Sequence, residues 1–179
     1  ILLRAEGEHF SAGADLNWMR EGLGQSPEQL LAESRELAGL FSSIHRSEHV
    51  VVTAVRGKVM GGANGLVAAS DIVVVEETAA FAFSEIKLGL IPATISPFVL
   101  RKMGYSRTKE LMLTGRLFHA KEAVEYGLAH VICGKGKLEE TADAVIKELL
   151  SNGPRAMKGI KSLLDTLDRP GANDRLSDL

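Results

Sequence analysis

Two apolar, β-branched runs flank a short stretch of glycine and alanine, and this arrangement limits the fold more than any other feature of the chain. Residues 50–55 and 72–75 are typical of buried strands, because Val and Ile pack well inside a sheet. Gly61 and Gly62 lie between the two runs and open a series of small residues that extends to Ala69. Small side chains at helical spacing allow a helix to lie close against another backbone. We therefore expect a strand, a glycine turn, a closely packed helix and a second strand in succession.

Capping residues and apolar spacing predict the other elements. Ser26, Pro27 and Gln29 supply an N-cap serine, a proline at the first helical position and a capping-box glutamine before apolar residues at helical spacing. Further strands are expected at residues 1–4, 81–83 and 130–133, and further helices at residues 96–103, 106–113, 120–126, 138–150 and 155–167. Ser96 is expected to cap the first of these helices, and Gly104 to end it. No internal repeat or linker divides the chain, which indicates a single domain.

Composition and charge exclude several classes of protein. The chain has 21 Lys and Arg residues and 23 Asp and Glu residues, so its formal net charge of −2 does not favour nucleic acid or an anionic membrane as a partner. No apolar run approaches the roughly 18 to 20 residues of a membrane span, and the first residues lack the pattern of a signal peptide. Cys133 is the only cysteine and cannot form an internal disulfide, so we expect a reducing, intracellular compartment such as the cytoplasm. Because Ile1 begins a strand-like segment, we also expect the 179 residues to be part of a longer chain.

Several familiar motifs are incomplete in this sequence. Gly22-x-Gly24 does not follow a strand and lacks the third glycine of a dinucleotide-binding turn. Gly57-Lys58 lacks both the Ser or Thr and the earlier glycine of a phosphate-binding loop. His45 and His49 are four residues apart, but a metal site needs three or four converging ligands, and a solvated helix end explains them better. No serine has the G-x-S-x-G context of a hydrolase.

A second turn of small residues, at positions 10–15, has the same physical character as the turn at Gly61 and Gly62. No bulky side chain blocks the first N–H groups after either turn, and a helix N-terminus adds a partial charge of about +0.5. The N–H groups of Ala14 and Gly62 are therefore candidate donors for an oxyanion hole, which requires two donors aimed at one point. The alternative is that both turns serve only tight bends and close packing.

One carboxylate, Glu85, follows the expected strand at residues 81–83, where the chain leaves the sheet. The apolar segment at residues 88–92 comes soon after it. Apolar surroundings disfavour the charged form, so they would raise the pKa of Glu85 toward a value useful for acid–base chemistry. The alternative is a surface carboxylate that is paired with Lys87.

Four segments, in this order and spacing, resemble the crotonase family, the enoyl-CoA hydratases and isomerases. They are residues 10–16 (FSAGADL), 56–75 (RGKVMGGANGLVAASDIVVV), 83–104 (FSEIKLGLIPATISPFVLRKMG) and 113–132 (LTGRLFHAKEAVEYGLAHVI). The resemblance implies an α/β fold, a single crotonase-like domain over residues 1–179 with N- and C-terminal parts of the family fold absent. Residues 1–133 would form a spiral of ββα turns, and residues 134–179 a helical region. It also implies a homotrimer or homohexamer.

The resemblance assigns roles to particular residues of this chain. The N–H groups of Ala14 and Gly62 would hold the oxygen of an acyl-CoA thioester, and Glu85 would be the catalytic acid or base. The residues that would bind substrate and CoA are Ala12, Ala14, Asp15, Leu16, Asn17 and Gly62. Family hydratases generally use a second, earlier glutamate, and that position is Gly65 here. No metal or redox cofactor is implied, and coenzyme A is the substrate carrier.

Two further positions depart from the family pattern. Residues 93–97 replace a glycine-rich turn of the family, which would reshape the acyl pocket. Asn17 stands where a lysine is often found near the nucleotide, which changes the expected contacts with the CoA phosphates.

A single glutamate leaves three functions open. A hydratase is our first hypothesis, with Glu85 protonating carbon while backbone groups or Asn64 hold the water, although a helix-start hydrogen bond is the simpler role for Asn64. An isomerase is the second, because one carboxyl group can move a proton between two carbons. A catalytically silent acyl-CoA-binding or assembly subunit is the third.

The sequence around Gly65 and residues 89–97 is similar to bacterial methylglutaconyl-CoA and carboxygeranoyl-type hydratases. This similarity implies a branched acyl group with a second carboxylate. Lys58, Lys87 and Arg101 are candidates to bind that carboxylate, and each is equally compatible with an ordinary surface position.

Overall fold

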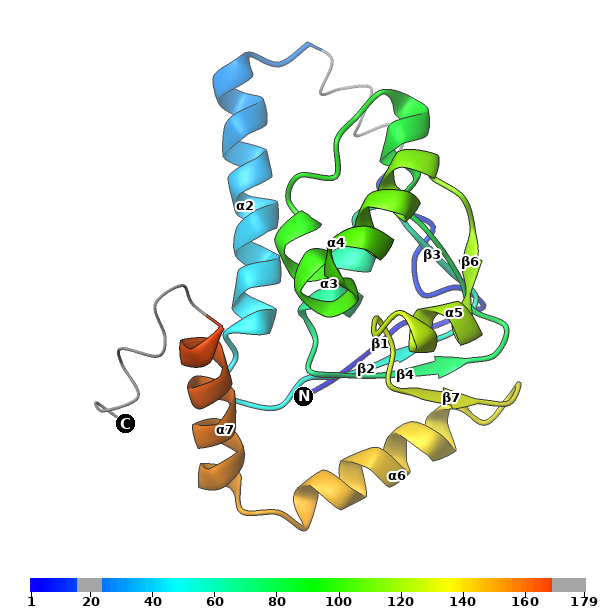
Figure 1. Cartoon of the computed structure of the whole chain (residues 1–179), viewed down its shortest axis with the longest axis vertical. Helices are drawn as coiled ribbons and strands as arrows, with labels where there is room; N and C mark the ends of the chain where they lie inside the picture. The colour runs from blue at the N-terminus through cyan, green and yellow to red at the C-terminus, as the bar shows by residue number, and fades with distance from the viewer. Residues whose placement is uncertain (16–23, 169–179) are drawn as a thin grey trace.

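The computed structural model describes residues 1–15 and 24–168 of the 179-residue chain, and its framework is a pair of sheets (Figure 1). The larger sheet has the order β1-β2-β4-β7 and is parallel throughout, with β1 at Leu2–Arg4, β2 at Val52–Val55, β4 at Ile72–Glu76 and β7 at Val131–Cys133. The smaller sheet has the order β3-β5-β6, with β3 at Lys58–Met60, β5 at Ala80–Ala82 and β6 at Phe118–His119. In it, β3 and β5 are parallel, whereas β5 and β6 are antiparallel.

The chain passes from the larger sheet to the smaller sheet and then into a helix, and it repeats this path. After β2 and β3 it forms α3 (Ala63–Ala69), and after β4 and β5 it forms the 3₁₀ helix η1 (Ser84–Leu88) and α4 (Ser96–Thr114). An isolated parallel bridge between Ser11 and Val59 extends the same pattern to the segment after β1. This path is the expected spiral of ββα turns, so the predicted fold class is confirmed.

Several helices match the sequence prediction closely. In α2 (Pro27–His45) the Ser26 hydroxyl accepts a hydrogen bond from the Gln29 N–H at 3.3 Å, and the Gln29 side chain accepts one from the Ser26 N–H at 2.8 Å. This reciprocal pair is the predicted capping box. The helix α6 occupies Leu138–Leu150 as predicted, and α5 and α7 occupy Ala120–Glu125 and Pro154–Leu167.

The region around α4 (Ser96–Thr114) agrees with the prediction at Gly104 and differs from it at Ser96. The backbone at Gly104 is not helical, with φ 71° and ψ 169°, so the two predicted helices are separate in geometry although they form one continuous element. The predicted cap at Ser96 is wrong. Ile95 is the N-cap residue, and the Ser96 hydroxyl instead donates to the Pro92 carbonyl at 2.7 Å, because that carbonyl lies one turn behind it.

Both faces of the larger sheet are covered, as its continuous apolar runs suggest. On one face, Val52, Ala54 and Val74 pack with the buried residues of α6. On the other face, Val55 and Val75 join the main core that also contains α3. Figure 1 shows α6 and α3 on opposite sides of these strands. The position of α3 at the centre of the molecule explains its small side chains.

Within the described residues, no helix is long and apolar enough to cross a lipid bilayer.

Candidate active site

A parallel pairing brings together the two turns that supply the candidate backbone donors. The Ser11 N–H donates to the Lys58 carbonyl at 3.0 Å, and the Met60 N–H donates to the Ser11 carbonyl at 3.1 Å. Ser11 is in register with Val59, and because the bridge is parallel, the two segments leave it in the same direction. A Cβ atom at Gly13 would lie 3.5 Å from the Met60 carbonyl oxygen, so the two turns adjoin beyond the bridge.

The glycine turn uses one of its N–H groups in a backbone hydrogen bond and leaves the next one, that of Gly62, without an acceptor among the described residues. Gly61 has φ +55°, a left-handed conformation that favours glycine, and its N–H donates to the Ala82 carbonyl at 3.0 Å. Gly62 is the N-cap residue of α3. Neither the Gly62 N–H nor the Ala14 N–H donates a hydrogen bond to any residue in the part of the chain that the structure describes. Both groups are therefore available to a ligand.

Asn64 stabilises this turn from behind. Its side-chain Nδ2 donates to the carbonyls of Gly61 and Ala82, at 2.9 Å each, and the residue is fully buried. The helix-start role predicted as the simpler one is confirmed. The amide nitrogen is consequently occupied with backbone acceptors and is not available to position a water molecule.

Glu85 lies in η1, immediately after β5, and its carboxylate faces the glycine turn. A Cβ atom at Gly61 would lie 3.5 Å from Glu85 Oε1 and equally close to the Ser84 hydroxyl. The Oε2 atom is buried and has no hydrogen-bond partner among the described residues. Burial raises the pKa of the Glu85 carboxyl above its usual value, partly offset by a backbone hydrogen bond. Lys87 is exposed, and no ion pair joins it to Glu85 within residues 1–15 and 24–168.

The position that would carry a second glutamate is closed by apolar side chains. A Cβ atom at Gly65 would lie 2.5 Å from Ile95 Cγ2 and 2.8 Å from two ring atoms of Phe41. Both of these side chains are almost completely buried, with 0% and 1% of their surfaces exposed. Sequence analysis missed this role of Phe41 and Ile95, because nothing in their spacing connects them to residue 65. Position 65 therefore supplies no second carboxyl group to the site.

The other predicted contacts fall into three groups. Ala12, Ala14 and Asp15 are exposed on the loop that follows the Ser11 bridge. Leu16 and Asn17 lie outside the described residues. Among the candidate cations, Arg101 forms ion pairs with Asp165 and Asp168, whereas Lys58 and Lys87 are exposed.

Comparison with known families agrees with this geometry. The model of the family described as enoyl-CoA hydratase/isomerase matches residues 1–175. The chain belongs to the enoyl-CoA hydratase/isomerase family. It is therefore an enzyme of the hydratase or isomerase type.

Individual members of the enoyl-CoA hydratase/isomerase family are similar over most of the chain. An enoyl-CoA hydratase from Shewanella pealeana is 43% identical, with a TM-score of 0.92, and the similarity covers 99% of this chain and 68% of that one. A Thermobifida fusca protein solved in complex with CoA is 27% identical, with a TM-score of 0.88, and is covered over 71% of its length against 98% of this chain. A trans-2-decenoyl-[acyl-carrier-protein] isomerase of Streptococcus mutans is 31% identical over 166 residues, which are 92% of this chain and 63% of that protein.

A hollow lined by charged residues lies at the C-terminal end of α3, whereas the glycine turn of the candidate site lies at its N-terminal end. It has a volume of about 660 Å³ and lies among α2, α4 and α7, where Ser70 and Asp71 follow the C-terminal end of α3. Of the residues proposed for substrate binding it contains only Arg101, and neither Glu85 nor the candidate backbone donors line it. No group of three or more His, Cys, Asp or Glu side chains in the described part of the chain is arranged to hold a metal ion.

Proposed function

We propose that this protein is a hydratase that adds water to the α,β-double bond of an enoyl-CoA thioester. The observation that carries the proposal is the half-buried Glu85 carboxyl, which lies against the Gly61 and Gly62 turn with one oxygen unpartnered among the described residues. A carboxyl group with a raised pKa retains its proton closer to neutral pH, so it can donate that proton as an acid. The carboxylate that results can then accept a proton as a base.

The expected chemistry uses one carboxyl group and two backbone donors. Water attacks the β carbon, and negative charge develops on the thioester oxygen as an enolate forms. The N–H groups of Ala14 and Gly62 would stabilise that oxygen, since fixed donors act most strongly where charge develops. Glu85 would give its proton to the α carbon and take one proton from the attacking water, so that one water molecule is added in total.

An isomerase is the second candidate, and the packing around Gly65 favours it. Phe41 and Ile95 leave no room for a second carboxyl group that would orient water. With Glu85 alone, the enzyme would remove a proton from one carbon and return it to another. The Streptococcus mutans relative is named as an isomerase, which supports this alternative.

The substrate class is the finer part of the proposal. We propose a branched acyl-CoA that carries a second carboxylate, with Lys87 as the cation that meets it. Lys87 is exposed and lies on the same 3₁₀ helix as Glu85. Arg101 is a weaker candidate than the sequence suggests, because Asp165 and Asp168 already neutralise it.

We also propose that the protein uses no metal or redox cofactor, that it acts as a homotrimer or homohexamer, and that it is cytoplasmic. Exposed leucines on α2 and α7 support self-association. Leu31, Leu40 and Leu164 expose 50%, 48% and 59% of their surfaces, more than a helix surface in contact with its partner would leave in water.

Product mass distinguishes the candidate activities. The whole protein is incubated separately with crotonyl-CoA, methylglutaconyl-CoA and a 3-enoyl-CoA, with Glu85→Gln as the matched control. With the wild-type protein, we expect the mass of crotonyl-CoA or of methylglutaconyl-CoA to increase by one water molecule. With the Glu85→Gln variant, we expect no increase in mass. Rearrangement at constant mass would identify an isomerase. Binding of all three thioesters without any product would support the silent subunit instead.

A further inference from the structure

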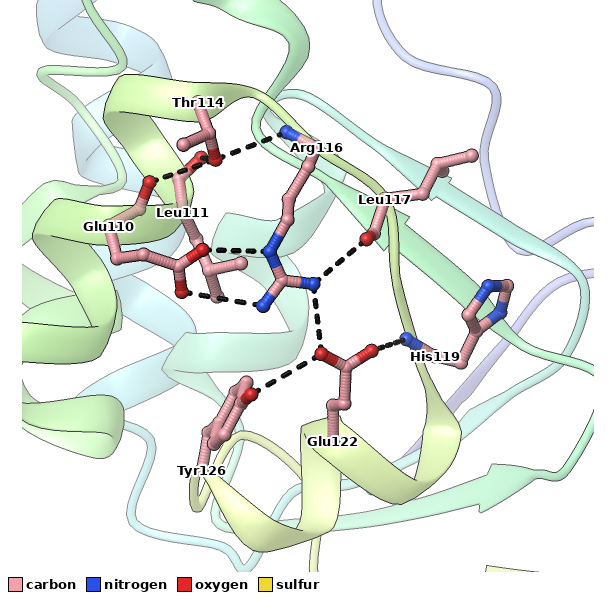
Figure 2. Close-up of polar contacts among 8 residues, drawn as sticks. All are labelled: Glu110, Leu111, Thr114, Arg116, Leu117, His119, Glu122 and Tyr126. Carbon is pink, nitrogen blue, oxygen red and sulfur yellow. Dashed lines mark hydrogen bonds and ion pairs between the residues drawn. The ribbon is translucent and has the colours of Figure 1, made fainter.

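A cluster of polar side chains fixes the corner between α4 and α5 (Figure 2). Arg116 lies at its centre. Its Nε donates to Glu110 Oε1 at 2.7 Å, and one terminal nitrogen donates to Glu122 Oε1 at 2.8 Å and to the Leu117 carbonyl at 3.1 Å. The other terminal nitrogen lies 3.4 Å from Glu110 Oε2. Because Glu110 belongs to α4 and Glu122 to α5, this guanidinium joins the two helices across the corner.

Further contacts hold Glu122 in place on the α5 side of the corner. The Tyr126 hydroxyl donates to Glu122 Oε1 at 3.3 Å, and the His119 N–H donates to Glu122 Oε2 at 3.0 Å. The Arg107 guanidinium lies 4.6 Å from the centre of the Tyr126 ring. The carboxylate that receives Arg116 is thus itself oriented by two donors.

The same corner is in direct contact with the helix that carries Glu85. Gly115 has φ +56°, and a Cβ atom there would lie 2.7 Å from Ile86 Cγ2 and 3.4 Å from the Phe83 carbonyl oxygen. Phe83 is the N-cap residue of η1, and Ile86 is the residue after Glu85. The backbone between Thr114 and Arg116 therefore packs directly against η1.

The far end of the corner is anchored separately in the core. Phe118 is fully buried, and its ring stacks on Phe81 and Phe83 with centroid distances of 5.3 Å and 5.8 Å. Phe118 also pairs with Phe81 across the antiparallel strands β5 and β6. With this end fixed by the core, the clamp of Arg116 on Glu110 and Glu122 is the next polar contact that holds the backbone beside η1.

We propose that Arg116 is a positioning residue for Glu85: its clamp on Glu110 and Glu122 holds Gly115 against η1 and so sets the direction of the carboxylate toward the Gly61 and Gly62 turn. This inference rests on the proposed catalytic role of Glu85. A guanidinium suits the task better than an ammonium group, because its planar fork reaches two carboxylates at once in a fixed geometry.

The test compares Arg116 with another arginine that forms an ion pair. Arg56 donates to Glu139 at 2.8 Å and has a similar exposure, but its partner is on α6, away from η1. We expect Arg116→Ala to lower kcat about 10- to 100-fold with little change in KM, because a small misplacement of a catalytic group has an effect of that size. Arg116→Lys should fall between Arg116→Ala and the wild type, and Arg56→Ala should stay close to the wild type. Amide hydrogen exchange at residues 84–90 should rise in Arg116→Ala only.

A second variant tests the contact without touching the ion pairs. Ile86→Ala removes the side chain that meets Gly115, and 42% of the Ile86 surface is exposed, so the variant should fold. We expect a similar fall in kcat and no further fall in the double variant with Arg116→Ala, since both changes break one coupling. Normal kcat in either single variant, equal loss in Arg56→Ala, or fully additive effects would overturn the proposal. Turnover that persists in Glu85→Gln would instead overturn the proposed function itself.

Discussion

At the scale of the residue, the carboxyl group of Glu85 combines two properties that rarely occur together in a stable protein. It is withdrawn from water, and one of its oxygens has no partner among the described residues. Such a group destabilises the fold when it is ionised, because desolvation disfavours the charge. Stability alone would favour a neutral residue at this position, whereas acid–base chemistry requires the carboxyl group.

The raised pKa of Glu85 makes a prediction about stability and pH. The folded state holds this proton to a higher pH than the unfolded state does, so the free energy of unfolding should fall as pH rises from the ordinary pKa of the group through its raised folded value. Glu85→Gln should therefore be more stable than the wild type at about pH 7, and the difference should disappear below about pH 4. Urea unfolding at both pH values measures it. A variant that is less stable than the wild type at neutral pH would contradict this account.

Proline at position 62 would remove the backbone donor of Gly62. Gly62 has φ −55°, which is within the range that proline adopts, and Gly62→Pro eliminates the N–H group. Gly62→Ala is the matched variant, since it retains the N–H and its Cβ would meet no atom within 4 Å. We expect kcat of the proline variant to be about 10² to 10³ lower than that of the alanine variant, the usual effect of one oxyanion donor. Equal turnover in the two variants would exclude this donor.

At the scale of the element, α3 is limited by what packs on it. Its residues are small because two other helices, α2 and α4, lie against it, and Gly65 is where Phe41 of α2 and Ile95 at the start of α4 approach most closely. The absence of a second carboxylate therefore depends on how α2, α3 and α4 pack around position 65, as well as on the residue at that position. Replacing Gly65 by glutamate alone would force a charge into an apolar contact.

Gly65→Ala tests this packing. The added methyl group would overlap Ile95 and Phe41, and overpacking of this kind costs about 1 to 3 kcal/mol in the free energy of unfolding. Phe41→Leu in the same chain should recover part of that loss, because it shortens one of the two side chains in conflict. Urea denaturation of the single and double variants measures both effects. If Gly65→Ala were as stable as the wild type, the space around α3 would be larger than the distances indicate.

At the scale of the whole molecule, α6 and α7 are attached by different forces. Leu138 and Ala142 of α6 are buried on the larger sheet, whereas no residue of α7 is buried. Ion pairs hold α7 beside the end of α2, through Lys158 with Glu48 at 2.6 Å and Lys161 with Asp71 at 2.5 Å (Figure 1). The Lys158–Glu48 pair is open to solvent, so it is weak and is screened by salt, whereas Lys161 and Asp71 expose only 17% and 25% of their side chains.

Salt should therefore loosen α7 selectively. At about 1 M salt the screening length falls to about 3 Å, which weakens exposed pairs and leaves apolar contacts intact. We expect amide hydrogens of α7 (Pro154–Leu167) to exchange faster in high salt, and those of α6 (Leu138–Leu150) to keep their rates. Mass spectrometry of peptides from the two helices compares them within one sample. Equal behaviour of both helices would show that α7 has another attachment.

Local chemistry predicted much of this architecture correctly. The cap at Ser26 and the helix at Leu138–Leu150 depend on neighbours within a turn or two, so the sequence contains everything needed to identify them. The short strands β3 and β6 were not predicted: β6 has only two residues, and β3 has one buried residue between two that are not buried, so neither forms an apolar run. The error at Ser96 has a different origin: its hydroxyl donates to the Pro92 carbonyl instead of capping the helix.

The sequence by itself determined the succession of strands, glycine turn and helix, the family resemblance, and the choice of Glu85 as the candidate acid or base. Only the tertiary structure decided that the turn after Ser11 adjoins Met60, just before the glycine turn, that Phe41 and Ile95 close the space at Gly65, and that Gly115, next to Arg116, lies against the helix of Glu85. The physical reason is the separation along the chain over which each interaction acts. Propensity and capping act over a few residues, whereas the neighbours of a site come from strand register and side-chain packing between segments that are far apart in the chain.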